Sequence, residues 1–212
     1  MSTFIDISMP LSRQTPAWPG SPGASTSLFR SQEAGEDANA SLIEMDVHTG
    51  THIDAPAHML PGGPTMDRYA LGAGIGEAIV ADTGPAPAID AETLAGLDLP
   101  EDCRRLLLQT SNSRRPELQH EFSPDYAALT LSGAEWIADR GIELVGIDYV
   151  SIQLFSAPTE THHVLFRAGV VILEGLRLDA AEPGSYELLC LPLRLTGCEA
   201  APARAVLRRL HD

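Results

Sequence analysis

Residues 48–58 read HTGTHIDAPAH and hold three of the seven histidines in this 212-residue chain. A helix is disfavoured here because Gly50 lies between two threonines. In an extended segment alternate residues share one side, so His48, His52 and Asp54 would face the same way. Gly50 between the two histidines would leave room there for water or a substrate. Two imidazoles and a carboxylate suit Zn²⁺ or Mn²⁺, and we therefore expect a metal site on an extended segment.

The alternatives for this segment are a polar surface loop and a structural zinc site. Three histidines and one aspartate within eleven residues make an ordinary polar loop a poor explanation. A structural zinc site is disfavoured because such sites usually use cysteine and fill all four coordination positions. The mixed nitrogen and oxygen donors leave the choice between Zn²⁺ and Mn²⁺ open.

A second cluster consists of His162, His163 and Glu174. Adjacent residues on a helix point about 100° apart, so only one of the two histidines can face a common centre. Glu174 ends the apolar run 170–173, where a carboxylate needs a partner to offset its desolvation. That partner is either an arginine or a metal ion. The first cluster supplies too few ligands for two ions, and a shared Asp54 with His162 and Glu174 would complete a second site.

The charge composition excludes several classes of function. Arginine supplies all 14 positive charges against 29 acidic residues, so the chain has no lysine and a net charge of -15. Without lysine it can form neither a Schiff base nor the lysine contact of a phosphate-binding loop. Such an acidic excess repels phosphate backbones and anionic lipids. We expect a small-molecule substrate and no nucleic-acid or membrane partner.

The cysteines and the N-terminus indicate a cytoplasmic protein. Cys103, Cys190 and Cys198 form no CxxC pair, and we expect them to be reduced and mostly buried. The first residues show no secretory signal, and no apolar run approaches the roughly 20 residues that span a bilayer.

The hydrophobic pattern predicts one mixed α/β domain over residues 1–212, with helices packed against an antiparallel or mixed sheet. For the helix at 132–140, Ser132 and Glu135 fit a capping box and Gly141 fits a helix stop. Residues 31–40 are small and acidic and predict a solvated loop. Further helices are predicted at 91–96 and 160–168, and strands at 4–8, 41–47, 76–81, 105–109, 142–147, 170–173, 186–196 and 203–209.

The segment HTGTHIDAPAH resembles the HxGTHxDxPxH signature of the cyclase-type metal-dependent hydrolase family, which includes bacterial kynurenine formamidases and the related isatin hydrolases. The resemblance covers nearly the whole chain. It extends to the stretches FIDISMPLS, PAWPGSP, LSGAEWIADRGIELVGIDYVS, HHVLFRAGVVILEGLRLD and GSYELLCLPLRLTGCEAAPARAVL. It implies a swivelling β/β/α domain, two Zn²⁺ ions per subunit (or Mn²⁺), no organic cofactor, and a homodimer or larger homo-oligomer.

The resemblance also implies roles for individual residues. One ion would be bound by His48, His52 and Asp54, and the second by Asp54, His162 and Glu174, with Asp54 bridging. His162 is preferred over His163 because it stands twelve residues before the glutamate, as in the family. His58 matches the catalytic histidine, and Trp18 matches an aromatic wall for an aryl substrate.

The function implied is that of an arylformamidase in tryptophan catabolism, which cleaves N-formyl-L-kynurenine to L-kynurenine and formate. His58 would take a proton from water and deliver it to the leaving nitrogen, and Thr51 or the Gly50 backbone would help to hold the oxyanion. The loop 149–156 and Met59 depart from the family pattern close to the expected substrate. The alternatives are therefore a cyclic-amide hydrolase of the isatin type and a non-catalytic metal-binding relative.

Overall fold

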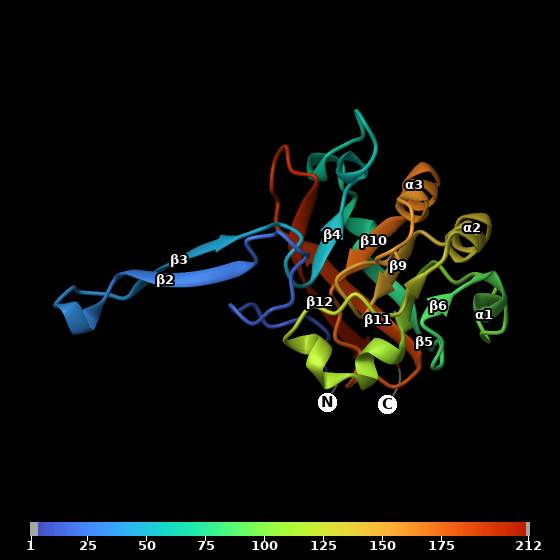
Figure 1. Cartoon of the computed structure of the whole chain (residues 1–212), viewed down its shortest axis with the longest axis horizontal. Helices are drawn as coiled ribbons and strands as arrows, with labels where there is room; N and C mark the ends of the chain where they lie inside the picture. Colours follow the sequence, from blue (N-terminus) through green and yellow to red (C-terminus); the bar gives the residue numbers. More distant parts are fainter. Residues whose placement is uncertain (1–3, 211–212) are drawn as a thin grey trace.

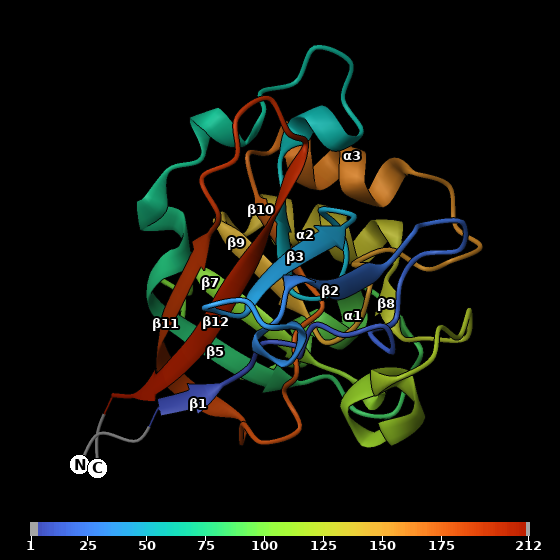
Figure 2. The ribbon, with the colours of Figure 1, turned by 90° about the vertical axis from the view of Figure 1, so that its left-hand side faces the viewer.

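The computed structural model describes residues 4–210, and its centre is an eight-stranded sheet that closes on itself (Figures 1 and 2). The strand order is β1-β12-β11-β5-β7-β9-β10-β4, and β12 also pairs with β4. The strands are β1 (Phe4–Asp6), β4 (His52–Asp54), β5 (Ile75–Asp82), β7 (Arg105–Gln109), β9 (Leu144–Ile147), β10 (Val171–Glu174), β11 (Gly184–Pro192) and β12 (Ala200–Arg209).

The sheet is mixed, as predicted. The parallel pairs are β5–β7, β7–β9 and β9–β10. The remaining pairs of this sheet are antiparallel. The apolar runs of β7 and β9 are buried on both faces, which is typical of parallel strands covered on both sides. Leu106 and Leu108 pack into the cluster that includes Ile137 and Leu165 of the helices. Leu107, between them, packs into the opposite cluster.

Three α-helices cover one part of the sheet, at the positions that the sequence predicts within one residue at each end. They are α1 (Ala91–Ala95), α2 (Leu131–Asp139) and α3 (Glu160–Arg167). Gly141 and Gly169 follow α2 and α3 with positive φ angles of 73° and 75°, where a left-handed residue ends a helix.

The predicted capping box at the start of α2 is wrong. The N-cap is Thr130, whose side chain accepts a hydrogen bond from the Gly133 N–H, so the helix begins one residue earlier. The Ser132 hydroxyl instead contacts the Thr130 hydroxyl and the Ala91 N–H. The Thr130 N–H itself donates to the Ile89 carbonyl oxygen, next to the β6–β8 pairing that precedes the helix.

Two small pairings lie outside the main sheet and were not predicted, apart from the second strand of the first pair. Strands β2 (Ala24–Arg30) and β3 (Ala40–Met45) pair antiparallel, and β6 (Ala88–Ile89) pairs parallel with β8 (Ala128–Leu129). Short 3-10 turns occupy Gln32–Ala34, Pro56–His58, Met66–Arg68, Leu71–Gly74, Ser111–Arg114 and Pro116–Gln119.

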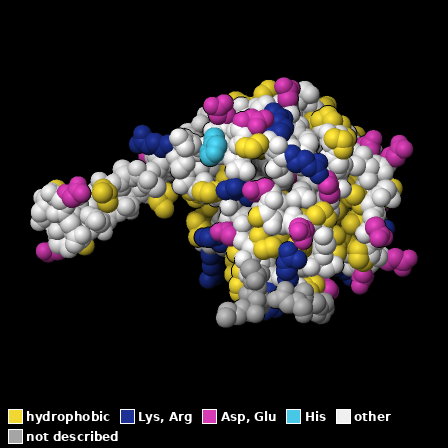
Figure 3. All heavy atoms as spheres, turned by 90° about the horizontal axis from the view of Figure 1, so that it is seen from below, with side chains coloured by type: hydrophobic (Ala, Val, Ile, Leu, Met, Phe, Trp, Pro, Cys, Tyr) yellow, Lys and Arg dark blue, Asp and Glu magenta, His cyan; other side chains and the backbone are white. Residues whose placement is uncertain are grey.

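The β2–β3 hairpin, which we call the arm, projects away from the body of the molecule (Figures 1 and 3). Its tip is the acidic segment 31–39, which is largely exposed, as expected for a solvated loop. Four large apolar side chains on its strands are between 54% and 64% exposed: Leu28, Phe29, Leu42 and Ile43. The arm therefore offers apolar surface that the chain does not cover itself.

The three cysteines are free, with Cys103 and Cys190 buried and Cys198 partly buried, as expected. None of the helices among residues 4–210 combines the length and the apolar character needed to cross a bilayer.

Candidate metal centre

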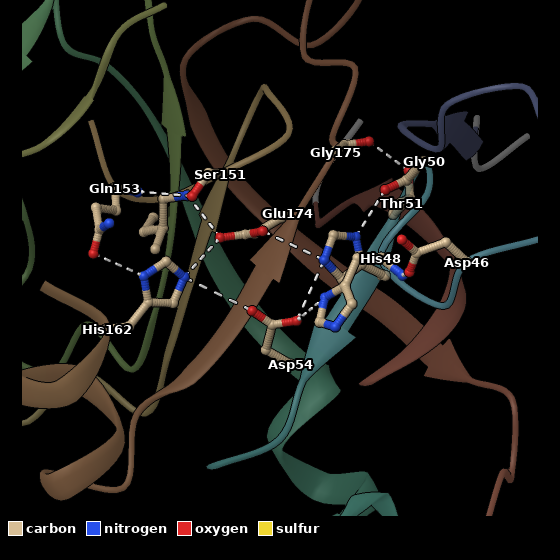
Figure 4. Close-up of polar contacts among 12 residues, drawn as sticks. Asp46, His48, Gly50, Thr51, Asp54, Ser151, Gln153, His162, Glu174 and Gly175 are labelled. Atoms are coloured by element: carbon tan, nitrogen blue, oxygen red, sulfur yellow. Dashed lines mark hydrogen bonds and ion pairs between the residues drawn. The ribbon is translucent and has the colours of Figure 1, made fainter. Parts of the chain in front are cut away.

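Two neighbouring strands bring the predicted ligands together at one end of the sheet (Figure 4). Strands β4 and β10 pair antiparallel, with His52 opposite Glu174 and Asp54 opposite Ile172. Directly opposed residues share a face of the sheet, and so do residues two apart on one strand. Register alone therefore places His52, Asp54 and Glu174 side by side. His162 reaches the same point from α3.

Asp54 lies at the centre of the cluster and divides its two oxygens between opposite sides. Its Oδ1 lies 3.0 Å from His48 Nδ1 and 3.3 Å from His52 Nε2, and its Oδ2 lies 3.9 Å from His162 Nε2. Glu174 is divided in the same way, with Oε2 at 3.3 Å from His52 Nε2 and Oε1 at 3.3 Å from His162 Nε2. The cluster therefore has two sides, which we call lobes, one at His48 and His52 and the other at His162, and both carboxylates lie between them.

The polar atoms of this cluster are buried and incompletely satisfied. His52, Asp54, His162 and Glu174 are at most 3% exposed. Within residues 4–210, His52 Nε2 and both Asp54 oxygens find no hydrogen-bond partner of acceptable geometry. An unsatisfied buried carboxylate is costly, and a divalent cation would remove that cost. The residues present therefore fit a metal site.

The charges within the cluster shift the pKa values of its histidine and aspartate in opposite directions. Burial opposes ionisation of His52, but the nearby carboxylates of Asp54 and Glu174 outweigh it and raise the pKa of His52 to about 10. Burial likewise opposes ionisation of Asp54, but the close approach of His48 and His52 outweighs it and holds the pKa of this carboxyl well below its usual range. Positive charge is thus strongly favoured beside these two carboxylates.

The segment before β4 differs from the prediction. Only residues 52–54 are extended, and residues 47–51 form a turn in which Gly50 has a positive φ of 73°. A side chain at Gly50 would meet Leu11 rather than open space, so the expected role of Gly50 in leaving room for water or substrate is wrong. The turn instead fixes the orientation of His52, because His52 Nδ1 lies 2.9 Å from the Gly50 carbonyl oxygen and donates to it.

The expected role of Thr51 in holding an oxyanion is also wrong. Its hydroxyl donates to the Gly175 carbonyl oxygen and accepts the Met9 N–H at 2.8 Å. Both partners belong to the packing around β4, and the side chain is buried. The main-chain donor of Gly50 is its N–H, and its role in holding an oxyanion stays a prediction.

Two contacts to the second lobe were not predicted. The Ile152 N–H donates to Glu174 Oε1 at 2.7 Å. His162 Nδ1 lies 3.2 Å from Gln153 Oε1 (Figure 4). Both residues lie in the loop 149–156, which the sequence singles out only because it departs from the family pattern. A further unpredicted neighbour is Glu199, whose Oε1 lies 3.6 Å from His48 Nε2.

His58 lies in the short 3-10 turn that follows β4. Its ring centroid is 4.2 Å from that of His48 and 5.9 Å from that of His162. Burial lowers the pKa of His58 and outweighs the opposing charges of Asp54 and Glu174, and the nearby His48 and His162 add smaller lowering effects. A neutral imidazole beside two buried carboxylates is suited to accept a proton. One ring nitrogen also lies within 4.8 Å of ligand atoms of His48 and Asp54.

A cavity of about 510 Å³ opens beside the cluster. Its lining includes His48, His58, His162 and Glu174, together with Trp18. The Trp18 ring packs 5.2 Å from Phe155 and 5.8 Å from Phe122, centroid to centroid, and these two rings were not predicted. The cavity is thus lined both by polar residues of the cluster and by the aromatic ring of Trp18. His163 is not among the residues that line it.

Comparison with known proteins places this chain in a family. Residues 5–153 match the family described as "Putative cyclase". Kynurenine formamidase of Bacillus cereus is 36% identical over 208 residues, which cover 98% of each chain. Cyclase-like protein 1 of Arabidopsis thaliana is 36% identical over 96% of this chain and 84% of its own.

Solved structures share the fold. One described as a potential metal-dependent hydrolase with cyclase activity superposes with a TM-score of 0.86 at 34% identity, and the match covers 100% of both chains. Isatin hydrolase A from Labrenzia aggregata superposes with a TM-score of 0.81 over 99% of this chain and 94% of its own, and at 22% identity this likeness concerns the fold alone. The predicted fold class is thus confirmed, and the chain belongs to the cyclase family of metal-dependent hydrolases.

Proposed function

We propose that this chain is a metal-dependent amide hydrolase of the arylformamidase type, which cleaves N-formyl-L-kynurenine to L-kynurenine and formate. The observation that carries the proposal is the pair of buried carboxylates, Asp54 and Glu174, with unpartnered Asp54 oxygens and three histidines around them. The likeness to a kynurenine formamidase over nearly the whole chain supports the choice of substrate.

We propose two Zn²⁺ ions as the resident cofactor, with Mn²⁺ also compatible with the donor set. His48, His52 and Asp54 would hold one ion, and Asp54, His162 and Glu174 the other. When bound, two divalent ions polarise a carbonyl group and lower the pKa of water. No organic cofactor is part of the proposal.

The residues of the chain supply proton transfer and positioning. His58, neutral because of its burial, takes a proton from the attacking water at a ring nitrogen and delivers it to the leaving amine nitrogen. The C–N bond of the formamide breaks, a C–O bond forms, and formate and the free aryl amine result. Trp18 packs against the aryl ring of the substrate, which brings the formamide group to the carboxylate side of the cavity.

The test is a parallel assay of the metal-loaded full chain on N-formyl-L-kynurenine and on isatin. We expect turnover of the formamide to exceed that of isatin. Faster turnover of isatin would instead support a cyclic-amide hydrolase of the isatin type. No turnover of either substrate by a fully metal-loaded protein would favour a non-catalytic metal-binding relative.

We also propose that the chain forms a homodimer or larger homo-oligomer through its arm, and that it acts in the cytoplasm on a small molecule, without a nucleic-acid or membrane partner. The exposed apolar side chains on the arm support assembly, because uncovered surface of this kind marks interaction sites. Three free cysteines are compatible with a reducing compartment.

A further inference from the structure

The histidines of the two lobes are oriented by different kinds of hydrogen-bond acceptor at their Nδ1 atoms. His52 Nδ1 donates to a main-chain oxygen, that of Gly50. His162 Nδ1 instead faces a side-chain amide, that of Gln153, at 3.2 Å. A main-chain carbonyl accepts hydrogen bonds whatever the side chain, whereas a side-chain amide can be replaced. The orientation of His162 therefore depends on one particular residue.

The orientation of the Gln153 amide is itself determined by its surroundings. Its Nε2 lies 3.5 Å from the Ala157 carbonyl oxygen, which can only accept a hydrogen bond. Its main-chain oxygen accepts the Tyr126 hydroxyl at 2.7 Å, and its N–H donates to the Ser151 hydroxyl. Nε2 therefore faces Ala157, and Oε1 faces His162.

An amide oxygen at this position determines which nitrogen of His162 carries a proton. A cation in this lobe needs the lone pair of His162 Nε2, the atom 3.3 Å from Glu174 Oε1 and 3.9 Å from Asp54 Oδ2. Gln153 Oε1 can only accept, so it stabilises the tautomer in which Nδ1 carries the proton and Nε2 carries the lone pair. Gln153 and His162 are 7% and 2% exposed, so water competes little for this hydrogen bond.

We propose that Gln153 is a positioning residue that fixes the tautomer of His162 and thereby sets the metal affinity of the lobe formed by Asp54, His162 and Glu174. This inference rests on the proposed function in one respect, that this lobe binds a metal ion. The amide orients His162 without adding charge, whereas a carboxylate at the same place would also increase the basicity of the imidazole.

The experiment is a titration of the metal-free full chain with Zn²⁺ in competition with a chromophoric chelator. We expect the wild type to bind two equivalents. Gln153→Leu should weaken one equivalent by roughly 10–100-fold and leave the other unchanged. Gln153→Glu, which keeps an acceptor for His162 Nδ1, should restore the weakened equivalent to wild-type affinity or above.

Gln109→Leu is the matched control. The Gln109 amide donates to the Leu178 and Ala181 carbonyl oxygens at 2.6 and 2.9 Å and is not part of the metal centre. Losing this amide should lower the melting temperature without changing either Zn²⁺ affinity. The control separates loss of a well-bonded amide from loss of the contact to His162.

Two results would overturn the inference while leaving the proposed function intact. One is wild-type affinity for both equivalents in Gln153→Leu, and the other is an equal weakening of both equivalents that Gln153→Glu does not reverse. A wild-type chain that binds fewer than two equivalents would overturn the inference and the two-ion site of the proposed function together. No substrate enters the titration, so failure of the substrate assignment alone does not affect it.

Discussion

Asp54 is a buried carboxylate whose hydrogen-bonding capacity is not satisfied by the residues around it. It is 3% exposed, and neither oxygen has a hydrogen-bond partner among the described residues. Asp54→Ala should lose bound metal from both lobes, because both share this side chain. Metal content after gel filtration, measured by elemental analysis, checks this expectation.

A stability measurement gives an independent check on the role of Asp54. A ligand that binds only the folded state at 100 times its Kd stabilises it by about 2.7 kcal/mol. A chelator should therefore lower the melting temperature of the wild type and leave that of Asp54→Ala unchanged. An equal chelator effect on both proteins would mean that the metal binds elsewhere.

His58→Ala should lower kcat by roughly 10²–10⁴-fold while the protein keeps its metal. The reason is that His58 lies on the cavity wall, and its burial lowers its pKa and keeps the ring neutral. His163→Ala is the control, since His163 does not line the cavity. Unchanged turnover in His58→Ala would refute its role as a base, and loss of metal would make it a ligand instead.

At the junction of β4 and β10, Gly175 determines how closely the two strand ends approach. It has a positive φ of 69°, and a Cβ there would lie 2.1 Å from the Gly50 carbonyl oxygen, the atom that accepts from His52. Gly175→Ala should destabilise the fold by about 2–5 kcal/mol, from a left-handed alanine and from overpacking. Displacing Gly50 should also weaken metal binding through His52.

Gly169→Ala is the matched control for this substitution. Gly169 has a similar φ of 75°, but nothing lies within 4 Å of its added Cβ. Its cost should be limited to about 1–2 kcal/mol for the left-handed conformation, with metal binding retained. Urea denaturation and Zn²⁺ titration of both variants measure the two effects. Equal losses in the two variants would show that the Gly50–Gly175 contact is unimportant.

Local sequence patterns predicted the helices and most strands of the main sheet, but not the turn at 47–51. Apolar runs and stop glycines such as Gly141 and Gly169 are signals carried within a few residues. The conformation of Gly50 depends instead on Leu11, Thr15 and Gly175, which lie far away along the chain. The sequence of the histidine-rich segment does not show such contacts. The prediction that residues 48–54 are all extended, with alternate side chains on one side, was therefore wrong for residues 48–51.

For the candidate site, the sequence predicted the side chains that the structure brings together but not the groups that hydrogen-bond to them. His48, His52, Asp54, His162 and Glu174 were expected from residue type and resemblance, and they gather around Asp54. Gln153 and the Ile152 N–H depend on how the loop 149–156 folds. A main-chain N–H is present in almost every residue type, so the sequence does not show which one contacts Glu174. The contacts of Ile152 and Gln153 could therefore be found only in the structure.

Closure of the sheet depends on one long strand. Strand β12 pairs with β4 through residues 200–202 and with β1 through residues 206–208, on the same edge. This double pairing carries β4, and the metal ligands on it, to the side of a strand about 150 residues later in the chain. Period-two alternation predicts strands but not their partners, so the closed sheet did not follow from the sequence.

The arm lacks the packing contacts within the described residues of one chain that would stabilise it. In its antiparallel register Thr26 is opposite Ile43 and Ser27 is opposite Leu42, so the two large apolar residues lie on opposite faces. A two-stranded hairpin without further packing is at best marginally stable in water. A second copy of the chain that covers both faces would supply the missing packing.

The double variant Leu28→Ser with Ile43→Ser should therefore shift the protein from an oligomer to the 22.6 kDa monomer. Light scattering coupled to gel filtration measures the mass directly. Leu131→Ser is the control, because Leu131 is also an exposed apolar residue, 43% accessible, but lies at the start of α2. A monomeric wild type would refute assembly, and an unchanged mass in the double variant would place the interface away from this face of the arm.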